Sequence, residues 1–144
     1  MLMVADAQYN ILIVDDFAAF RRFAISALRQ ISDFLVAHEA ADGLEAVGRA
    51  KQLQPDLILL DISLPGINGI EAARQIRRVS PNSKVLFFTQ ESSVEVMEEA
   101  LRVGAHGYLL KSDANELSLA LDEVLNDRLF VSSRLRPGTV VGNF

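Results

Sequence analysis

The fold of this chain is decided by the stretch PDLILLDISLPGING, residues 55–69. Four consecutive aliphatic residues, 57–60, lie between Pro55 and a turn rich in proline and glycine. Such a run predicts a short strand buried on both faces, as in a parallel sheet. Asp61 follows directly, so we expect its carboxylate at the carboxyl edge of the sheet, where open α/β sheets bind ligands. For this stretch alone, an ordinary surface-turn carboxylate is an equal alternative.

Outward from this stretch, further apolar runs predict strands and the segments between them predict helices. The other expected strands are residues 10–14, 34–37, 84–89 and 107–111. Apolar residues at helical spacing predict helices at residues 17–30, 44–53, 70–79, 92–104 and 113–125. Ser92 with Glu95, and Asp113 with Glu116, are the expected starts of the last two helices.

The strict alternation of strands and helices determines the expected architecture. Short connections and continuous aliphatic strands predict a parallel sheet covered by helices on both sides. We therefore expect an α/β fold with a doubly wound five-stranded parallel sheet, flavodoxin-like with strand order 2-1-3-4-5, and about five helices. The domain should span residues 10–127, after an N-terminal extension at 1–9. Residues 128–144 are expected to form a C-terminal tail, mobile from Arg134 on, or the start of a linker.

The composition limits the possible chemistry and partners. The chain has 144 residues, no cysteine and a formal net charge of −5. Disulfides, thiolate metal sites and cysteine nucleophiles are thereby excluded. The acidic balance argues against nucleic-acid binding by this chain itself. No apolar run approaches the ~18 residues of a membrane span. Residues 1–9 lack the pattern of a signal peptide, so we expect no membrane association and a cytoplasmic location.

Five polar residues lie at the carboxyl ends of the predicted strands and should meet at one edge. In the order 2-1-3-4-5 the first and third strands are neighbours, which brings Asp15 and Asp16 next to Asp61, with Thr89 and Lys111 from the next two strands. Taken singly, each has an ordinary interpretation, such as a helix cap, a strand-end hydroxyl or a solvated lysine. Together, three carboxylates repel one another unless a cation joins them.

A magnesium ion suits this group of residues best. Mg²⁺ prefers oxygen ligands and keeps several waters, so a few carboxylates, a carbonyl and a substrate phosphate oxygen match it. Two histidines and no cysteine are too few for a zinc-type site. A carboxylate beside such a metal can also act as a nucleophile and form an aspartyl-phosphate.

These motifs also resemble a known family. The chain is similar to the receiver domain of bacterial two-component response regulators over about residues 10–127. Its Gly-Tyr-Leu-Leu-Lys sequence is closest to receivers of LuxR-type (NarL/FixJ-like) regulators. The similarity rests on motifs that occur in order, each at a strand end: Val14-Asp15-Asp16, Leu60-Asp61, Leu64-Pro65-Gly66, Asn68-Gly69, Phe88-Thr89, Gly104-Ala105 and Gly107-Tyr108-Leu109-Leu110-Lys111.

The resemblance implies a role for each matched position. Asp61 would be the phosphoacceptor, and Asp15 and Asp16 the acidic pair that holds Mg²⁺. Asp61 itself and the backbone carbonyl of Ser63 would complete the protein ligands.

Three further positions match residues that respond to the phosphoryl group. Lys111 would pair with the phosphoryl group, Thr89 would move toward it, and Tyr108 would rotate with the switch. The chain departs from the family pattern at Gln90, where a small residue is usual, and we expect this side chain to restrict access to the site. It departs again in ending without a second domain.

The resemblance implies a signalling function. We expect a phosphorylation-activated switch of a two-component system, phosphorylated on Asp61 by a sensor histidine kinase or a phosphotransfer protein. It would not be an enzyme, although it would catalyse its own phosphorylation and dephosphorylation. The face formed by residues 92–126 is expected to support a homodimer. The alternatives are a Mg²⁺-dependent phosphatase with an aspartyl nucleophile and a phosphorylation-independent binding module of receiver-like fold.

Overall fold

A computed structural model describes residues 8–136 of the chain. Its centre is a six-stranded sheet in the order β2-β1-β3-β4-β5-β6, and every neighbouring pair of strands is parallel. The strands are β1 (Tyr9–Val14), β2 (Leu35–Ala40), β3 (Leu57–Leu60), β4 (Lys84–Thr89), β5 (Gly107–Leu110) and β6 (Phe130–Val131). The predicted parallel, doubly wound architecture and the order of its first five strands are confirmed.

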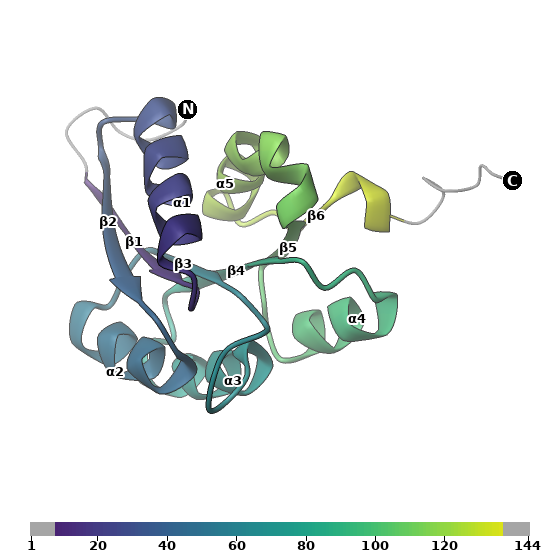
Figure 1. The fold of residues 1–144 in the computed structure, drawn as a ribbon, viewed down its shortest axis with the longest axis horizontal. Coiled ribbons are helices and arrows are strands. Elements are labelled where there is room, and N and C mark those ends of the chain that lie inside the picture. Colours follow the sequence, from purple (N-terminus) through teal and green to yellow (C-terminus); the bar gives the residue numbers. More distant parts are fainter. Residues whose placement is uncertain (1–7, 137–144) are drawn as a thin grey trace, which may run out of the picture.

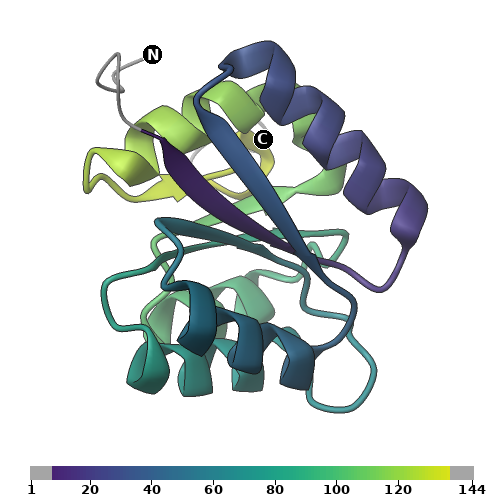
Figure 2. The ribbon, with the colours of Figure 1, turned by 90° about the vertical axis from the view of Figure 1, so that its left-hand side faces the viewer.

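The helices cover both faces of this sheet. Figures 1 and 2 show α1 and α5 on one face and α2, α3 and α4 on the other. The α-helices are α1 (Ala18–Ile31), α2 (Gly43–Leu53), α3 (Gly69–Val79), α4 (Val94–Arg102) and α5 (Leu117–Leu125). Two short 3₁₀ turns, η1 (Lys111–Glu116) and η2 (Ser133–Leu135), follow β5 and β6. No helix within residues 8–136 is long and apolar enough to cross a membrane.

The aliphatic strands form the core on both faces at once. On β3, Leu57 and Leu59 pack on the side of α1 and α5, whereas Ile58 and Leu60 pack on the side of α2, α3 and α4. All four residues of this strand are at most 1% exposed. Because successive side chains of a strand point to opposite faces, an uninterrupted aliphatic run is what a sheet covered on both sides requires.

The start of α3 fixes the backbone beside Asp61. Asn68 caps this helix, since its side chain accepts a hydrogen bond from the backbone N–H of Glu71 at 2.9 Å. A Cβ at Gly69 would collide with the backbone carbonyl oxygen of Asp61. The glycine therefore lets the helix begin directly against the loop that carries Asp61.

Two expected helix starts differ in the structure. Ser93 caps α4, not Ser92, because the Ser93 hydroxyl oxygen accepts from the N–H of Val96 at 3.3 Å. The spacing of Ser92 and Glu95 pointed to the wrong serine, because Glu95 instead accepts a hydrogen bond from the Ser93 hydroxyl at 3.1 Å. The segment from Asp113 forms the turn η1 before α5 begins at Leu117. Asp113 does not cap a helix, since its carboxylate pairs with Arg134 at 2.9 Å.

The sheet has one strand more than the five we expected. Residues 130–131, which we had assigned to the tail, add β6 to the free edge of β5. The N–H of Ser132 donates to the carbonyl of Tyr108 at 2.9 Å, and Phe130 is only 3% exposed. A two-residue strand is too short to leave a periodic pattern, so β6 was not predictable from periodicity. Residues 134–136 belong to η2 and its end, and the remainder of the expected mobile tail lies outside the described residues.

Candidate functional site

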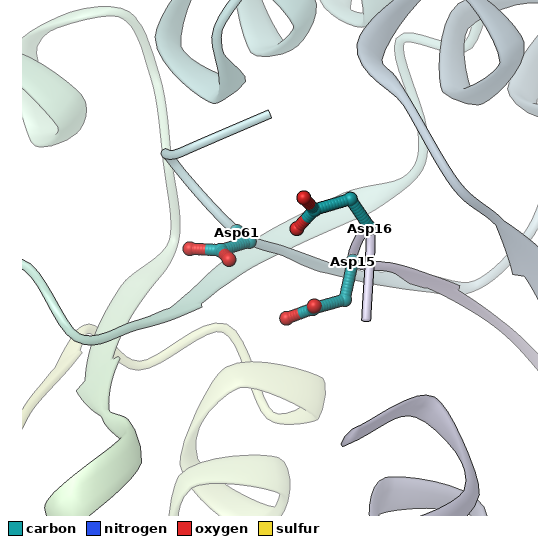
Figure 3. Close-up of side chains that lie close together, drawn as sticks. All are labelled: Asp15, Asp16 and Asp61. Atoms are coloured by element: carbon teal, nitrogen blue, oxygen red, sulfur yellow. The ribbon is translucent and has the colours of Figure 1, made fainter. Parts of the chain in front are cut away.

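The site lies at the carboxyl ends of β1 and β3. Val14 and Leu60 are partners in the parallel ladder, and the N–H of Asp61 donates to the carbonyl of Val14 at 3.0 Å. The residues that follow, Asp15 with Asp16 and Asp61, therefore leave the sheet side by side (Figure 3). One ligand oxygen from each of these three carboxylates lies within 4.8 Å of the other two. The predicted convergence of the three aspartates is thus present in the fold.

Two of the three carboxylates are buried. Asp15 is 1% exposed and Asp61 is 5% exposed, whereas Asp16 faces solvent. Asp15 Oδ1 accepts a hydrogen bond from the N–H of Phe17 at 2.9 Å, and this bond orients the chain into α1. Arg21 Nη1 donates to the backbone carbonyl of Asp15 at 2.6 Å. The backbone of β1 and the first turns of α1 therefore hold Asp15 in place.

Lys111 supplies the positive charge among these acids. Its Nζ lies 2.7 Å from Asp15 Oδ2 and 3.2 Å from Asp61 Oδ2. The lysine follows β5 directly, two strands away from β3 in the sheet, and its side chain is 13% exposed. A single ammonium does not balance the charge of three carboxylates, and a divalent cation can neutralise the remaining negative charge.

The surroundings of Asp61 shift its protonation. Burial raises the pKa of the Asp61 carboxyl above its ordinary value of 3.8, because the charged form loses its hydration. The hydrogen bond from Thr89 opposes this rise most strongly, followed by the charge of Lys111, whereas the charge of Asp15 adds to it. Thr89 and Lys111 are therefore the groups that keep Asp61 available as an anion.

Thr89 and Tyr108 are linked through the loop that follows β4. Thr89 is 1% exposed, and its hydroxyl oxygen accepts from the N–H of Glu91 at 3.3 Å. The Tyr108 hydroxyl donates to the carbonyl of the same Glu91 at 2.7 Å. Burial raises the pKa of the Tyr108 phenol, so this hydroxyl stays protonated and can donate. Tyr108 is fully buried, and its ring centroid lies 6.0 Å from that of Phe87, so the aromatic expected to rotate with the switch lies in the core in this structure.

The remaining predicted residues lie at the open side of the site. Ser63 is exposed, and its N–H donates to Asp61 Oδ1 at 3.4 Å. Gln90 is also exposed and directly follows Thr89 at the end of β4. The access role of Gln90 and the metal-binding role of the Ser63 carbonyl remain predictions.

One residue at the site was not expected from the sequence. Phe20 on α1 places its ring under the ammonium of Lys111, with 4.1 Å between Nζ and the ring centroid. Phe20 lies on the apolar side of α1, where it packs against Phe88 with the ring centroids 5.1 Å apart. Its position one helical turn after the acidic pair was the available signal, but apolar periodicity does not distinguish a core ring from one that also touches a lysine.

The residues present fit a magnesium ion. The donors are carboxylate oxygens, two of them in buried side chains, and they carry more negative charge than Lys111 balances. Hard oxygen donors of this kind are those that Mg²⁺ prefers. The identity of the donors and the excess charge therefore agree with the expected cofactor.

A family model places this geometry among known proteins. Residues 11–122 match the model of the response regulator receiver domain. The chain belongs to the response regulator receiver family. A receiver domain is a signalling switch rather than a classical enzyme. The family match therefore confirms the expectation, implied by the family resemblance, that the chain is such a switch.

Individual relatives of this receiver domain agree with the family model. The chain is 37% identical over 102 residues to the chemotaxis protein CheY of Thermotoga maritima, which covers 71% of this chain and 84% of that protein. It is 34% identical over 129 residues to the nitrate/nitrite response regulator NarL of Escherichia coli, covering 89% of this chain but only 60% of that protein. The chain thus matches most of the first relative and under two thirds of the second.

A solved structure shows the same arrangement of strands and helices. The crystal structure of a two-component response regulator of the LuxR family from an Aurantimonas species superimposes with a TM-score of 0.80 at 33% identity. The match covers 90% of this chain and 93% of that chain. The predicted similarity of this receiver domain to those of LuxR-type regulators is thereby confirmed.

Proposed function

We propose that this receiver domain is a switch activated by transfer of a phosphoryl group to Asp61. The observation that carries the proposal is the position of Asp61, a buried carboxylate between two further aspartates and the ammonium of Lys111. A nucleophilic carboxylate needs a nearby group that neutralises the incoming phosphoryl charge, and Lys111 lies 3.2 Å from it. The proposed donor is the phosphohistidine of a sensor histidine kinase or of a phosphotransfer protein.

The transfer exchanges one bond to phosphorus for another. An Asp61 carboxylate oxygen attacks the phosphorus, the new P–O bond forms and the P–N bond to the donor imidazole breaks. The imidazole leaves with the electron pair of that bond and takes up a proton. Lys111 Nζ and the Thr89 hydroxyl then donate charge-assisted hydrogen bonds to the phosphoryl oxygens. Hydrolysis of the acyl phosphate returns Asp61 and inorganic phosphate.

Asp15, Asp16, Asp61 and the backbone carbonyl of Ser63 would hold Mg²⁺ in this reaction. When bound, the ion supplies positive charge against the phosphoryl oxygens. Asp16 is exposed and is the one aspartate of the cluster without a contact to Lys111, so its carboxylate is the most accessible of the three.

Phosphorylation should be transmitted through Thr89 and Tyr108. Both side chains make hydrogen bonds with the backbone of Glu91, so a movement of Thr89 toward a phosphoryl group would alter the loop that Tyr108 holds. That loop leads directly into α4. We propose that the face made of α4, β5 and α5, residues 92–126, then supports a homodimer.

The C-terminal segment affects how that face would be used. Val131 and Leu135 pack against the core cluster that contains Met97 of α4, so β6 and η2 cover part of the proposed dimer face. Sedimentation velocity with and without beryllofluoride and Mg²⁺ tests the idea. A dimer that forms only with beryllofluoride supports it, and an unchanged monomer would direct the output elsewhere.

The cellular setting is part of the proposal. LuxR-family and NarL relatives support a role in transcription regulation, with DNA contacted by a partner domain or protein and not by this acidic chain. A histidine kinase as phosphodonor supports a cytoplasmic location. The family match does not support the phosphatase alternative. A phosphorylation-independent binding module would not need Asp61, Lys111 and Thr89 to be intact together.

Labelling with a small phosphodonor tests the proposed function. Acetyl phosphate or phosphoramidate with Mg²⁺ should add one phosphoryl group to the wild-type chain, seen as a single mass increase that alkaline hydroxylamine removes. Asp61→Asn should show no increase, whereas Asp56→Asn, an exposed aspartate before the same strand, should label like wild type. Labelling of Asp61→Asn at the wild-type level would contradict the assignment.

A further inference from the structure

Phe20 touches the group that the proposed function uses most directly. The ammonium of Lys111 lies 4.1 Å from the centroid of the Phe20 ring, well within the range of a cation–π contact. The same ammonium contacts Asp15 Oδ2 and Asp61 Oδ2. Lys111 is therefore held by two carboxylates and one aromatic face, and its side chain is only 13% exposed.

The Phe20 ring is itself held in position. The ring of Phe88, on β4 and 2% exposed, meets it edge-on with 5.1 Å between centroids and 68° between ring planes. Phe23, one turn along α1, lies on another side with 5.5 Å between centroids. A ring held by neighbours presents its face to the lysine at little further cost in side-chain entropy.

In this position Lys111 would compete with a metal ion for carboxylate oxygens. Asp15 Oδ1 already accepts a hydrogen bond from the N–H of Phe17. The other oxygen, Oδ2, lies 2.7 Å from the Lys111 ammonium, so a movement of the lysine side chain would free it. Asp61 Oδ2 also accepts from Lys111. The ammonium therefore occupies oxygens of two of the three proposed metal ligands.

We propose that Phe20 is a positioning residue that holds Lys111 against Asp15 and Asp61 in the metal-free domain and so makes Lys111 a competitor of Mg²⁺. This inference rests on the proposed function, because it concerns the same metal site. Its consequence is that Mg²⁺ binding requires Asp15 to release the ammonium. The lysine then becomes free to meet the phosphoryl group on Asp61.

Substitution of the ring separates an aromatic contact from simple packing. Phe20→Leu keeps an apolar side chain in the core but removes the aromatic face, so Mg²⁺ should bind at least about twofold more tightly, since even a solvent-exposed cation–π contact gives that much. Phe20→Tyr keeps the aromatic face and should bind Mg²⁺ like wild type. Phe23→Leu is the matched control, because Phe23 packs against Phe20 but is not in contact with Lys111. Calorimetric titration of metal-free protein gives each affinity.

The same Phe20 substitution in a background without Lys111 decides whether Phe20 acts through Lys111. In a Lys111→Met background no ammonium lies over the ring, so Phe20→Leu should no longer change the Mg²⁺ affinity. An equal change in both backgrounds would assign Phe20 a purely structural role and overturn the proposal.

A readout without metal checks the held position directly. Protons next to the Lys111 ammonium lie over an aromatic face, so their NMR signals should be shifted upfield in the metal-free wild type and should return to ordinary positions in Phe20→Leu. Ordinary positions in the wild type would overturn the proposal. If the wild type binds Mg²⁺ and labels at Asp61 while Phe20→Leu is unchanged in both readouts, only this inference fails. If the wild type binds no Mg²⁺, the proposed function fails, and the competition fails with it.

Discussion

Asp61 and Asp113 are both buried carboxylates at the carboxyl ends of the sheet, yet they are partnered in opposite ways. Asp61 is 5% exposed and lies among like charges, with Asp15 and Asp16 beside it. Asp113 is 4% exposed, and its Oδ1 pairs with Arg134 of the C-terminal segment at 2.9 Å. One carboxylate is placed where its charge is unfavourable, and the other where its charge is matched.

The difference separates a site from a structural link. Crowded like charges cost stability and persist where a ligand or reaction uses them. Around Asp113 the contacts instead join η1 to the C-terminal segment, since Glu116 also accepts from the Ser133 hydroxyl at 2.6 Å and lies 3.7 Å from Arg136. We infer that the first region serves binding and chemistry, and that the second fixes the path of the chain as it leaves the sheet.

The largest effect is expected from removing the partner of Asp113. Arg134→Met leaves a buried carboxylate without its cation, and Asp113 Oδ2 already makes no hydrogen bond within residues 8–136. The free energy of unfolding should fall by about 2 kcal/mol, the cost of an unpaired buried polar group. Urea denaturation measures it. Arg134→Lys should recover most of the loss, and an unchanged midpoint in Arg134→Met would show that this pair does not stabilise the fold.

The next effect concerns the metal. Asp16→Ala removes one carboxylate from the cluster, so Mg²⁺ affinity should fall about tenfold, or about 1.4 kcal/mol. Calorimetry or competition with a fluorescent chelator gives the dissociation constant. Asp42→Ala, which removes the cap of α2 away from the cluster, is the control. Equal affinity in Asp16→Ala and wild type would place the metal elsewhere.

Removing the charge of Asp61 should stabilise the domain, in contrast to Arg134→Met. The folded state favours the protonated Asp61 carboxyl because burial raises its pKa above 3.8. Wild type therefore loses stability as the pH rises from that ordinary value through the raised one, and Asp61→Asn does not. Without Mg²⁺ at neutral pH, Asp61→Asn should be more stable by about 1 kcal/mol, the usual size of a single substitution effect. This advantage should vanish at low pH. A lower melting temperature for Asp61→Asn at neutral pH would contradict the proposed charge crowding.

The smallest effect concerns the open side of the aspartate cluster. The region around Asp113 has no corresponding feature. Gln90 is exposed at the end of β4, and its side chain can restrict the approach of a phosphodonor to Asp61. Gln90→Ala should be phosphorylated about threefold faster by acetyl phosphate, less than 1 kcal/mol in the barrier. Stopped-flow kinetics at matched Mg²⁺ measure the rate. A rate at or below wild type would favour a glutamine that orients the donor or a water molecule.

The same two regions show how far sequence reasoning reaches. The cluster was predictable because each of its residues directly follows an aliphatic strand, and strand order alone then brings Asp15, Asp16 and Asp61 together. The C-terminal segment was not, because β6 has two residues and Arg134 meets Asp113 through side chains that share no periodic pattern. The contact between Phe20 and Lys111 was not predictable for a third reason. The packing role of Phe20 follows from helical periodicity, but this contact depends on where the ends of two side chains lie.

The small strand β6 also determines how the sheet can meet other chains. Without residues 130–131, β5 would present unpaired backbone N–H and C=O groups at an outer edge, the kind of edge onto which another strand can add. Ser132 extends this protection, since its hydroxyl accepts from the N–H of Leu110 at 2.7 Å. Strand addition directly onto β5 is therefore blocked at these residues, and the edge that β6 itself presents is only two residues long. Copies of the domain that meet at the α4–β5–α5 face must do so through side chains.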